Sequence, residues 1–227
     1  MWLLAVGLVM AFPGIVQAQQ DADMFSCIDP GRLGPGALEY RSDQYNDQLT
    51  IAPVMVGDRR VIRATKRRMR DGRTTAEATF DLEAASLAPV AFRIMTAERG
   101  VTVDLAVQDD RLTGRILQSS VSASAGGRPV LIGTGVDDVL ITAVDWGRCA
   151  AVTATTLGLN GTPAVISYAR VGERALAISG REVMVYEVLR QQGESRSRLF
   201  VTKSVPFVLA KKEIPDWPDT ELVALPK

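Results

Sequence analysis

Arginine and the carboxylates dominate the chemistry available to this chain, because its 227 residues include no histidine. Histidine is the usual proton carrier near neutral pH and the commonest transition-metal ligand. Its absence removes Ser-His and Cys-His nucleophile pairs. The sequence also lacks a Gly-x-Ser-x-Gly elbow and a Ser three residues before a Lys. We therefore predict a non-catalytic protein that uses no metal and no cofactor.

Carboxylates are the remaining acid/base groups, and they are scattered along the chain. A glycosidase needs two of them at a defined separation across a cleft, so a carboxylate-only hydrolase is the least favoured interpretation. The two Asp-Asp pairs lack the spaced oxygen ligands and the glycine of a calcium loop. We expect most of these groups to be solvated turn residues: Asp104, Asp109, Asp110, Asp137, Asp138, Asp145, Glu173 and Glu187.

The densest polar feature is a basic segment around Asp71-Gly72, a dipeptide typical of a tight hairpin. If the two arms pair, several guanidinium groups share a face and could bind lipid phosphates, anionic polysaccharide or an acidic partner. The alternative is that charge keeps an edge hairpin soluble, with Glu77 and Asp81 in the opposite arm. The basic residues are Arg59, Arg60, Arg63, Lys66, Arg67, Arg68, Arg70 and Arg73.

A second candidate site is apolar. Aromatic and apolar residues in the C-terminal half could line the concave face of a curved sheet and hold an acyl chain. The alternative is that they form the ordinary core, where such residues on strands are expected. The candidates are Trp146, Met184, Tyr186, Phe200, Phe207 and, near the C-terminus, Trp217.

The first eighteen residues predict export. Residues 2–16 are almost all apolar, and Val16-Gln17-Ala18 has the small-residue spacing of a signal-peptidase site, although no Lys or Arg precedes the run. The run is shorter than the roughly 20 residues that span a bilayer, so no membrane anchor is expected. We predict a signal peptide over residues 1–18, an extended N-terminal segment over 19–58 and a single β-rich domain over 59–227.

Two cysteines, Cys27 and Cys149, lie in the mature part. In an oxidising compartment an even count favours one disulfide. Two buried free thiols, or pairing with another chain, are the alternatives.

Short segments with period two, separated by turn residues, predict a mainly β protein built as a curved antiparallel meander, similar to a half-barrel. Separate strands are expected at residues 164–169 and 174–178, and a Ser, Ala and Gly loop at 119–127. The alternation fails between residues 136 and 159, where one short helical segment is expected. Its apolar stripe is Val139, Leu140, Ala143 and Trp146.

The order of these signals resembles a known exported family. Ser86-Leu87-Ala88-Pro89 precedes a strand, Arg111-Leu112-Thr113-Gly114 opens another, and Val171-Gly172-Glu173 leads through Gly180 to Tyr186-Glu187-Val188. This spacing resembles the family catalogued as domain of unknown function 3108. The resemblance implies an envelope protein on a strongly curved sheet, similar to the half-barrels of periplasmic lipoprotein carriers. It implies no active-site residue.

Equal numbers of basic and acidic residues, 26 each, argue against a nucleic-acid binder. We therefore expect a periplasmic binding or carrier protein for an apolar or amphipathic ligand, such as a lipid or a lipoprotein. The alternative is an interaction protein whose Arg-rich hairpin docks an acidic envelope component.

Overall fold

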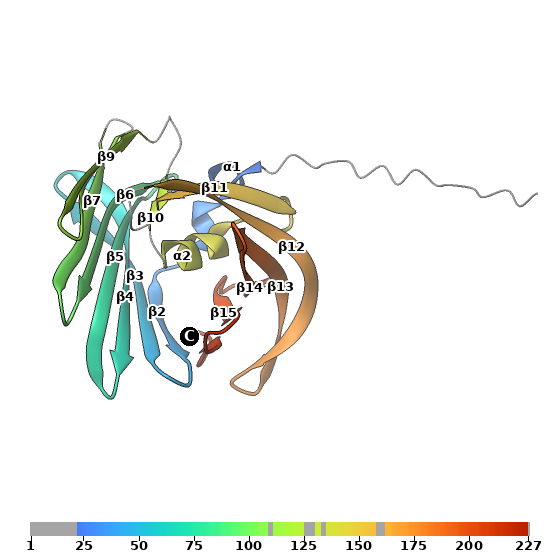
Figure 1. The fold of residues 1–227 in the computed structure, drawn as a ribbon. Helices are drawn as coiled ribbons and strands as arrows, with labels where there is room; N and C mark the ends of the chain where they lie inside the picture. Colours follow the sequence, from blue (N-terminus) through green and yellow to red (C-terminus); the bar gives the residue numbers. More distant parts are fainter. Residues whose placement is uncertain (1–21, 109–110, 125–129, 133–134, 158–161, 227) are drawn as a thin grey trace, which may run out of the picture.

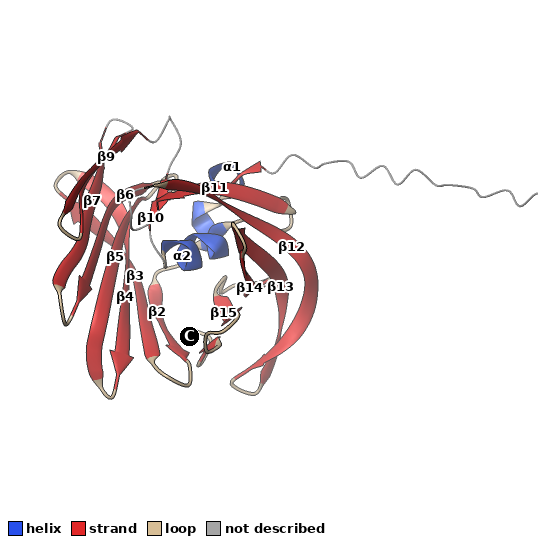
Figure 2. Cartoon of the chain, in the orientation of Figure 1, coloured by secondary structure: helices blue, strands red, loops and turns tan. Residues whose placement is uncertain are grey.

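The computed structural model describes residues 22–108, 111–124, 130–132, 135–157 and 162–226, so the expected signal peptide lies outside the described part. About 65% of the described residues are in strands, which confirms the mainly β prediction. Figure 1 shows one large sheet that curves around the helix α2 (Val136–Ala143). A second helix, α1 (Met24–Cys27), and a 3-10 turn at Pro30–Arg32 precede the main strands (Figure 2). No helix in the described ranges has the length and apolar character needed to cross a membrane.

The strands follow one another in this order. They are β1 (Ala22–Asp23), β2 (Gly36–Arg41), β3 (Asn46–Val56), β4 (Arg59–Arg70), β5 (Arg73–Glu83), β6 (Pro89–Thr96), β7 (Gly100–Gln108), β8 (Arg111–Ile116), β9 (Ser119–Ser124), β10 (Val130–Ile132), β11 (Ala151–Leu157), β12 (Pro163–Ile178), β13 (Arg181–Gln192), β14 (Ser195–Thr202), β15 (Leu209–Glu213) and β16 (Thr220–Leu222).

The sheet combines two antiparallel meanders, β2 to β9 and β11 to β16. Strand β16 pairs with β2 and so joins the C-terminal meander to the N-terminal one. Two short strands, β1 and β10, run parallel to β11. The sheet is therefore mixed rather than purely antiparallel. These parallel pairings join segments far apart in the chain, which a local alternation pattern does not reveal.

The hairpin at Asp71-Gly72 forms as expected. Both residues have positive φ, 51° and 72°, the conformation that the favoured two-residue hairpin turn requires. Ser179-Gly180 repeats this geometry between β12 and β13, with φ of 48° and 74°. These two turns set the register of the longest arms in the sheet.

The core lies on the concave face, between the sheet and α2. Every residue of α2 is buried, because the curved sheet surrounds the helix and leaves it no solvated side. Phe80 and Phe92, on β5 and β6, are fully buried and meet edge to face with ring centroids 5.8 Å apart. Phe80 and Leu82 alternate along β5 and are both buried, so the same face of this strand points toward the core.

Three local predictions need correction. The small polar residues of 119–124 predict a loop, but these residues form strand β9. Pairing with β8 provides hydrogen-bond partners for their backbone groups. The helix ends at Ala143, and β11 follows, so Trp146 lies outside the helix. The strands expected at 164–169 and 174–178 are one strand, β12, with a bulge between Arg170 and Gly172. Such a bulge bends a strand without ending it.

Residues 19–58, predicted as an extended segment, contain β2 and β3. Both strands pair within the same sheet as the strands of residues 59–222. This part of the chain therefore contributes to the curved sheet.

Candidate functional site

A cavity of about 640 Å³ lies on the inner side of the curved sheet. It is bounded by the ends of β5, β6 and β7 on one side and by β11 and β13 on the other, which are not neighbours in the strand order. The volume falls within the range of about 300–1,000 Å³ that is typical of small-molecule sites. One part of its wall is apolar, formed by Ile94, Ala97, Val103, Leu117 and Leu157.

Strand alternation explains why β6 contributes to this wall. Successive side chains point to opposite faces of a sheet. Phe92 is buried in the core, and Ile94, two residues further, lines the cavity on the same side. Arg93 and Met95 point to the outer face, where they line a separate hollow of about 330 Å³.

Strand β13 contributes Arg190 and Gln192 to the polar part of the cavity, beside threonines of other strands such as Thr102 and Thr156. The Arg190 guanidinium lines the cavity and donates from Nε to Asp137 Oδ2 (2.9 Å) and from Nη2 to Gln192 Oε1 (3.1 Å). The hydroxyl of Tyr168, on β12, donates to the same Asp137 oxygen at 3.2 Å. The other oxygen of Asp137 accepts the backbone N–H groups of Gly135 and Asp138. Asp137 therefore ties the start of α2 to β12 and β13 and holds Arg190 in place.

Asp138, the next residue of α2, belongs to a second buried ion network. Its carboxylate accepts hydrogen bonds from Lys66 Nζ on β4 (3.1 Å) and from Lys212 Nζ on β15 (2.5 Å). Lys66 also contacts Asp47 Oδ2 on β3 at 3.2 Å. Arg68 holds Asp47 with two hydrogen bonds of 2.9 and 3.0 Å. Buried charges are tolerated only when they are paired in this way.

The pKa values follow from burial and pairing. Burial alone would raise the pKa of Asp138, but the ammonium groups of Lys212 and Lys66 outweigh it and hold the pKa well below the ordinary value. Burial alone would lower the pKa of Lys66, but the Asp138 and Asp47 carboxylates raise it above the usual range. Burial, together with these two carboxylates, also raises the pKa of the Tyr40 hydroxyl. Asp138 and Lys66 are therefore ionised at neutral pH.

The chain was compared with protein families, curated proteins and solved structures. No protein-family model matches the chain, and no curated protein matches it in sequence. Among solved structures, the chain is similar to a β-barrel-like protein of domain of unknown function DUF1849 from Brucella abortus. The identity is 10%, the TM-score is 0.47, and the match covers 84% of this chain and 95% of that one. The resemblance to domain of unknown function 3108 stays a prediction.

The structure overturns the expectation that Asp137 and Asp138 are solvated turn residues, since they are 3% and 7% exposed. They are buried because α2 inserts into the curve of the sheet. Asp109 and Asp110 lie outside the described residues. The described ranges contain no group of three or more Cys, Asp or Glu side chains that could hold a metal ion.

Four residues of these two networks are not among the sites predicted from the sequence: Asp47, Tyr168, Arg190 and Lys212. For Asp47 a signal exists, because it alternates with Leu49 and Ile51, and all three are buried on the same face of β3. A carboxylate at the end of such an apolar face indicates a buried ion pair. For the other three we find no local signal.

The basic residues of the Arg-rich hairpin do not share one face. Alternation along β4 points Lys66 and Arg68 toward the interior, where they join the network around Asp47 and Asp138. Arg63 and Arg67 point outward. They face carboxylates at their cross-strand positions on β5 and bind them through Arg63–Asp81 (2.6 Å) and Arg67–Glu77 (2.6 Å).

The remaining basic side chains of the hairpin are exposed. Arg59 lies 3.7 Å from Glu83, and Arg70 Nε donates to the carbonyl of Gln44 at 3.4 Å. Arg60 and Arg73 form no ion pair with any residue that the structure describes. The hairpin therefore presents fewer unpaired cations than its sequence indicates.

The six residues proposed as an apolar ligand face occupy different environments. Trp146 and Phe200 are fully buried, Tyr186 is nearly so, and Met184 is 47% exposed. The guanidinium of Arg32 lies 4.3 Å from the ring centre of Phe207. None of the six lines the cavity described above. Trp217 is 61% exposed. A role of this set in ligand binding stays a prediction.

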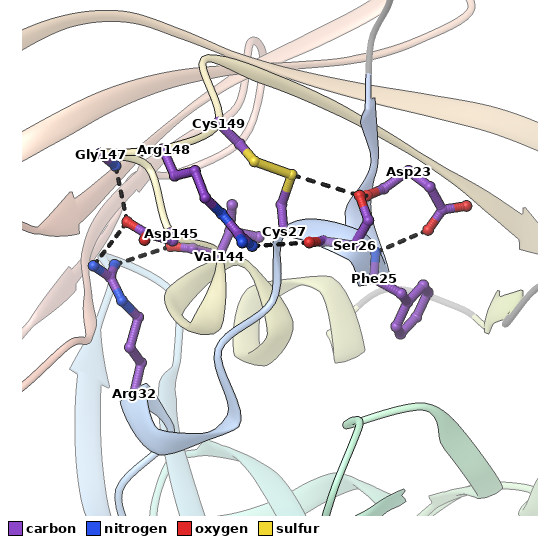
Figure 3. The surroundings of a disulfide bond; sticks show 10 residues. All are labelled: Asp23, Phe25, Ser26, Cys27, Arg32, Val144, Asp145, Gly147, Arg148 and Cys149. Atoms are coloured by element: carbon purple, nitrogen blue, oxygen red, sulfur yellow. Dashed lines mark hydrogen bonds and ion pairs between the residues drawn. A yellow bond between two sulfur atoms is a disulfide. The ribbon is translucent and has the colours of Figure 1, made fainter.

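The disulfide between Cys27 and Cys149 is present, with an S–S distance of 2.06 Å. It joins the end of α1 to the segment between α2 and β11 (Figure 3). Two arginines reinforce this connection. Arg32 donates to Asp145 Oδ1 at 3.0 Å, and Arg148 donates to the carbonyl of Ser26 at 2.8 Å. The N-terminal segment is thereby fixed beside the helix that carries Asp137 and Asp138.

Proposed function

We propose that this protein is a non-catalytic binding or carrier protein of the cell envelope, which holds an apolar or amphipathic ligand inside its curved sheet. One observation carries the proposal. The cavity between β5–β7 and β11/β13 has an apolar wall around Ile94 and Leu157 and a polar part at Arg190. Small-molecule sites combine a mostly apolar lining with a few fixed polar groups in this way.

The charges near the cavity favour binding over hydrolysis. A glycosidase-type mechanism needs one carboxyl group that is protonated near neutral pH. Asp137 accepts four hydrogen bonds, one of them from Arg190, and Asp138 faces two lysines. The two lysines hold the pKa of Asp138 well below its ordinary value, so this carboxyl group is ionised and does not donate a proton.

An exported, periplasmic location fits the disulfide. Such bonds form and persist in oxidising compartments, including the bacterial periplasm. The Cys27–Cys149 bond and the predicted signal peptide over residues 1–18 support the same location. The ligand is then a lipid, or the acyl part of a lipoprotein, of the envelope.

Docking of an acidic partner by the Arg-rich hairpin has less support. Arg63, Lys66, Arg67 and Arg68 already pair with carboxylates of the chain. A partner would have to replace these ion pairs or bind the exposed Arg59, Arg60, Arg70 and Arg73 alone.

The binding proposal is tested by lipid extraction and dye displacement. Protein purified from its native compartment should release lipid on extraction, detected by mass spectrometry. The delipidated protein should then bind a fluorescent apolar dye that a medium-chain lipid displaces. Protein that contains no extractable lipid and binds no dye would contradict the proposal.

Two tryptophan variants test whether the dye binds in this cavity. Ile94→Trp fills the cavity and should weaken dye binding at least tenfold. Met95→Trp adds the same ring to the outer face of the same strand, where Met95 is 44% exposed, and should leave dye binding unchanged. Circular dichroism verifies that both variants fold. Equal dye binding by the two variants would exclude this cavity as the site.

A further inference from the structure

We infer that the ligand carries an anionic head group, a carboxylate or a phosphate, and that Arg190 binds it. The inference rests on the proposed function and specifies the class of ligand. Arg190 is the charged residue of the inner wall on β13, and its side chain is 13% exposed. A ligand that places its tail along Ile94 and Leu157 therefore finds a cation at the opposite wall.

The guanidinium of Arg190 has donors to offer and no acceptor. It carries five N–H groups in a planar fork, and the hydrogen bonds to Asp137 and Gln192 use two of them. An oxyanion accepts such donors, often two at a time, through charge-assisted hydrogen bonds. A cationic head group would meet a like charge. An alcohol could accept a hydrogen bond from the guanidinium but carries no negative charge to pair with it.

Asp137 does not block this role. Its carboxylate also accepts from the Tyr168 hydroxyl and from the backbone N–H groups of Gly135 and Asp138. These three donors keep the Asp137 carboxylate hydrogen-bonded when the Arg190 guanidinium also binds a ligand. Asp137 thus positions the guanidinium at the cavity wall while the other side of the fork remains accessible.

A second polar group lies next to Arg190. Ser197, on β14, is directly opposite Arg190 in the strand pairing, so both side chains lie on the same face of the sheet. Its hydroxyl is buried, and within the described part of the chain it is the one buried side-chain N or O atom without a hydrogen-bond partner. Buried polar groups in native proteins are nearly always paired, but Ser197 does not line the cavity, so its hydroxyl is not a contact of the proposed head group.

The other charged residues of the cavity, Glu98 and Arg99, are both exposed on the turn between β6 and β7. They carry opposite charges, so they do not by themselves select an anion. The selectivity therefore depends on Arg190.

A series of ligands with one tail and three head groups tests the inference on the unmodified protein. Decanoate, decanol and decyltrimethylammonium are compared by dye displacement at neutral pH and moderate salt. We expect decanoate to bind about ten- to hundredfold more tightly than decanol, as a charge-assisted hydrogen bond predicts. The cationic ligand should bind more weakly than decanol.

Arg190→Gln should remove the preference for decanoate over decanol while decanol binding is kept. Arg93→Gln removes the same charge on the outer face of β6 and is the matched control, which should keep the preference. If Arg190→Gln does not fold, Arg190→Lys, which keeps the charge but loses the planar fork, should reduce the preference severalfold.

The outcomes separate the two proposals. If the tail binds and decanol binds as tightly as decanoate, the head-group inference is wrong while the proposed function stands. If none of the three ligands binds, the proposed function fails as well. A preference for decanoate that persists in Arg190→Gln would show that another cation binds the head group and would overturn the role of Arg190.

Discussion

Asp137 and Asp138 are consecutive residues of α2, yet their carboxylates bind different parts of the sheet. Asp137 binds Tyr168 and Arg190 on β12 and β13, whereas Asp138 binds lysines on β4 and β15. The first turn of the helix is thus fixed to both meanders. Carboxylates at this end of a helix are also favoured by its dipole.

Removing the charge of Asp138 should destabilise the fold strongly. Asp138→Asn leaves Lys66 and Lys212 buried without their common partner, and breaking a buried ion pair costs about 3–5 kcal/mol. The free energy of unfolding from urea titration measures this. Glu77→Gln is the control, because it breaks the more exposed pair with Arg67 and should cost at most about 1 kcal/mol. Equal losses of unfolding free energy in the two variants would contradict the buried ion network around Asp138.

Stability should fall in acid, and Asp138 should account for part of the fall. Its pKa in the folded state is depressed from 3.8, so the unfolded chain binds protons more readily as the pH falls below about 4. The stabilisation is therefore present above that pH and is lost below it. Urea titrations across this range should show a shallower decline for Asp138→Asn. If the free energy of unfolding fell equally steeply with pH in the variant, the pKa of Asp138 would not be depressed in the folded state.

The same network predicts loss of stability in strong alkali. The pKa of Lys66 in the folded state is raised above 10.5, so its contribution is complete below that pH and disappears as the pH rises through the folded-state value. Lys66→Met should flatten this alkaline limb in urea titrations. A limb that is equally steep in the variant would assign the effect to other groups.

Loss of the disulfide should cost about 4–5 kcal/mol in the chain-entropy treatment, because the bond closes a loop of 122 residues. Thermal unfolding of a Cys27→Ser/Cys149→Ser variant measures the loss. Adding a reductant should lower the melting temperature of the unmodified protein toward that of the variant and leave the variant unaffected. A reductant effect on both proteins would indicate a cause other than this bond.

Gly114 should not tolerate a side chain. Its φ is +142°, and a Cβ atom there would lie 2.1 Å from the backbone oxygen of Asp104 on the paired strand. Gly114→Ala should therefore cost about 3 kcal/mol or more, since strain and overpacking add. Gly36→Ala is the control, because a Cβ at Gly36 meets no atom within 4 Å. Denaturant titration gives the free energy of unfolding of both variants. If Gly114→Ala lost as little stability as Gly36→Ala, the close approach of Gly114 to the Asp104 backbone would be refuted.

The sequence alone predicts the fold class and the Asp71-Gly72 hairpin, and it favours the cysteine pairing over free thiols or pairing with another chain. These features depend on local alternation, on turn residues with positive φ and on an even cysteine count, all of which can be read over short stretches of chain.

Tertiary packing is needed to establish the burial of Asp137 and Asp138, the ion-pair partners of Lys66 and Arg68, and the cavity at Arg190. Each depends on which distant strands become neighbours. The partners of Asp138 are 72 and 74 residues away, and those of Asp137 are 31 and 53 residues away. A charged residue on an alternating strand has the same sequence pattern whether it faces water or an opposite charge. Only the curvature of the sheet around α2 distinguishes the two cases.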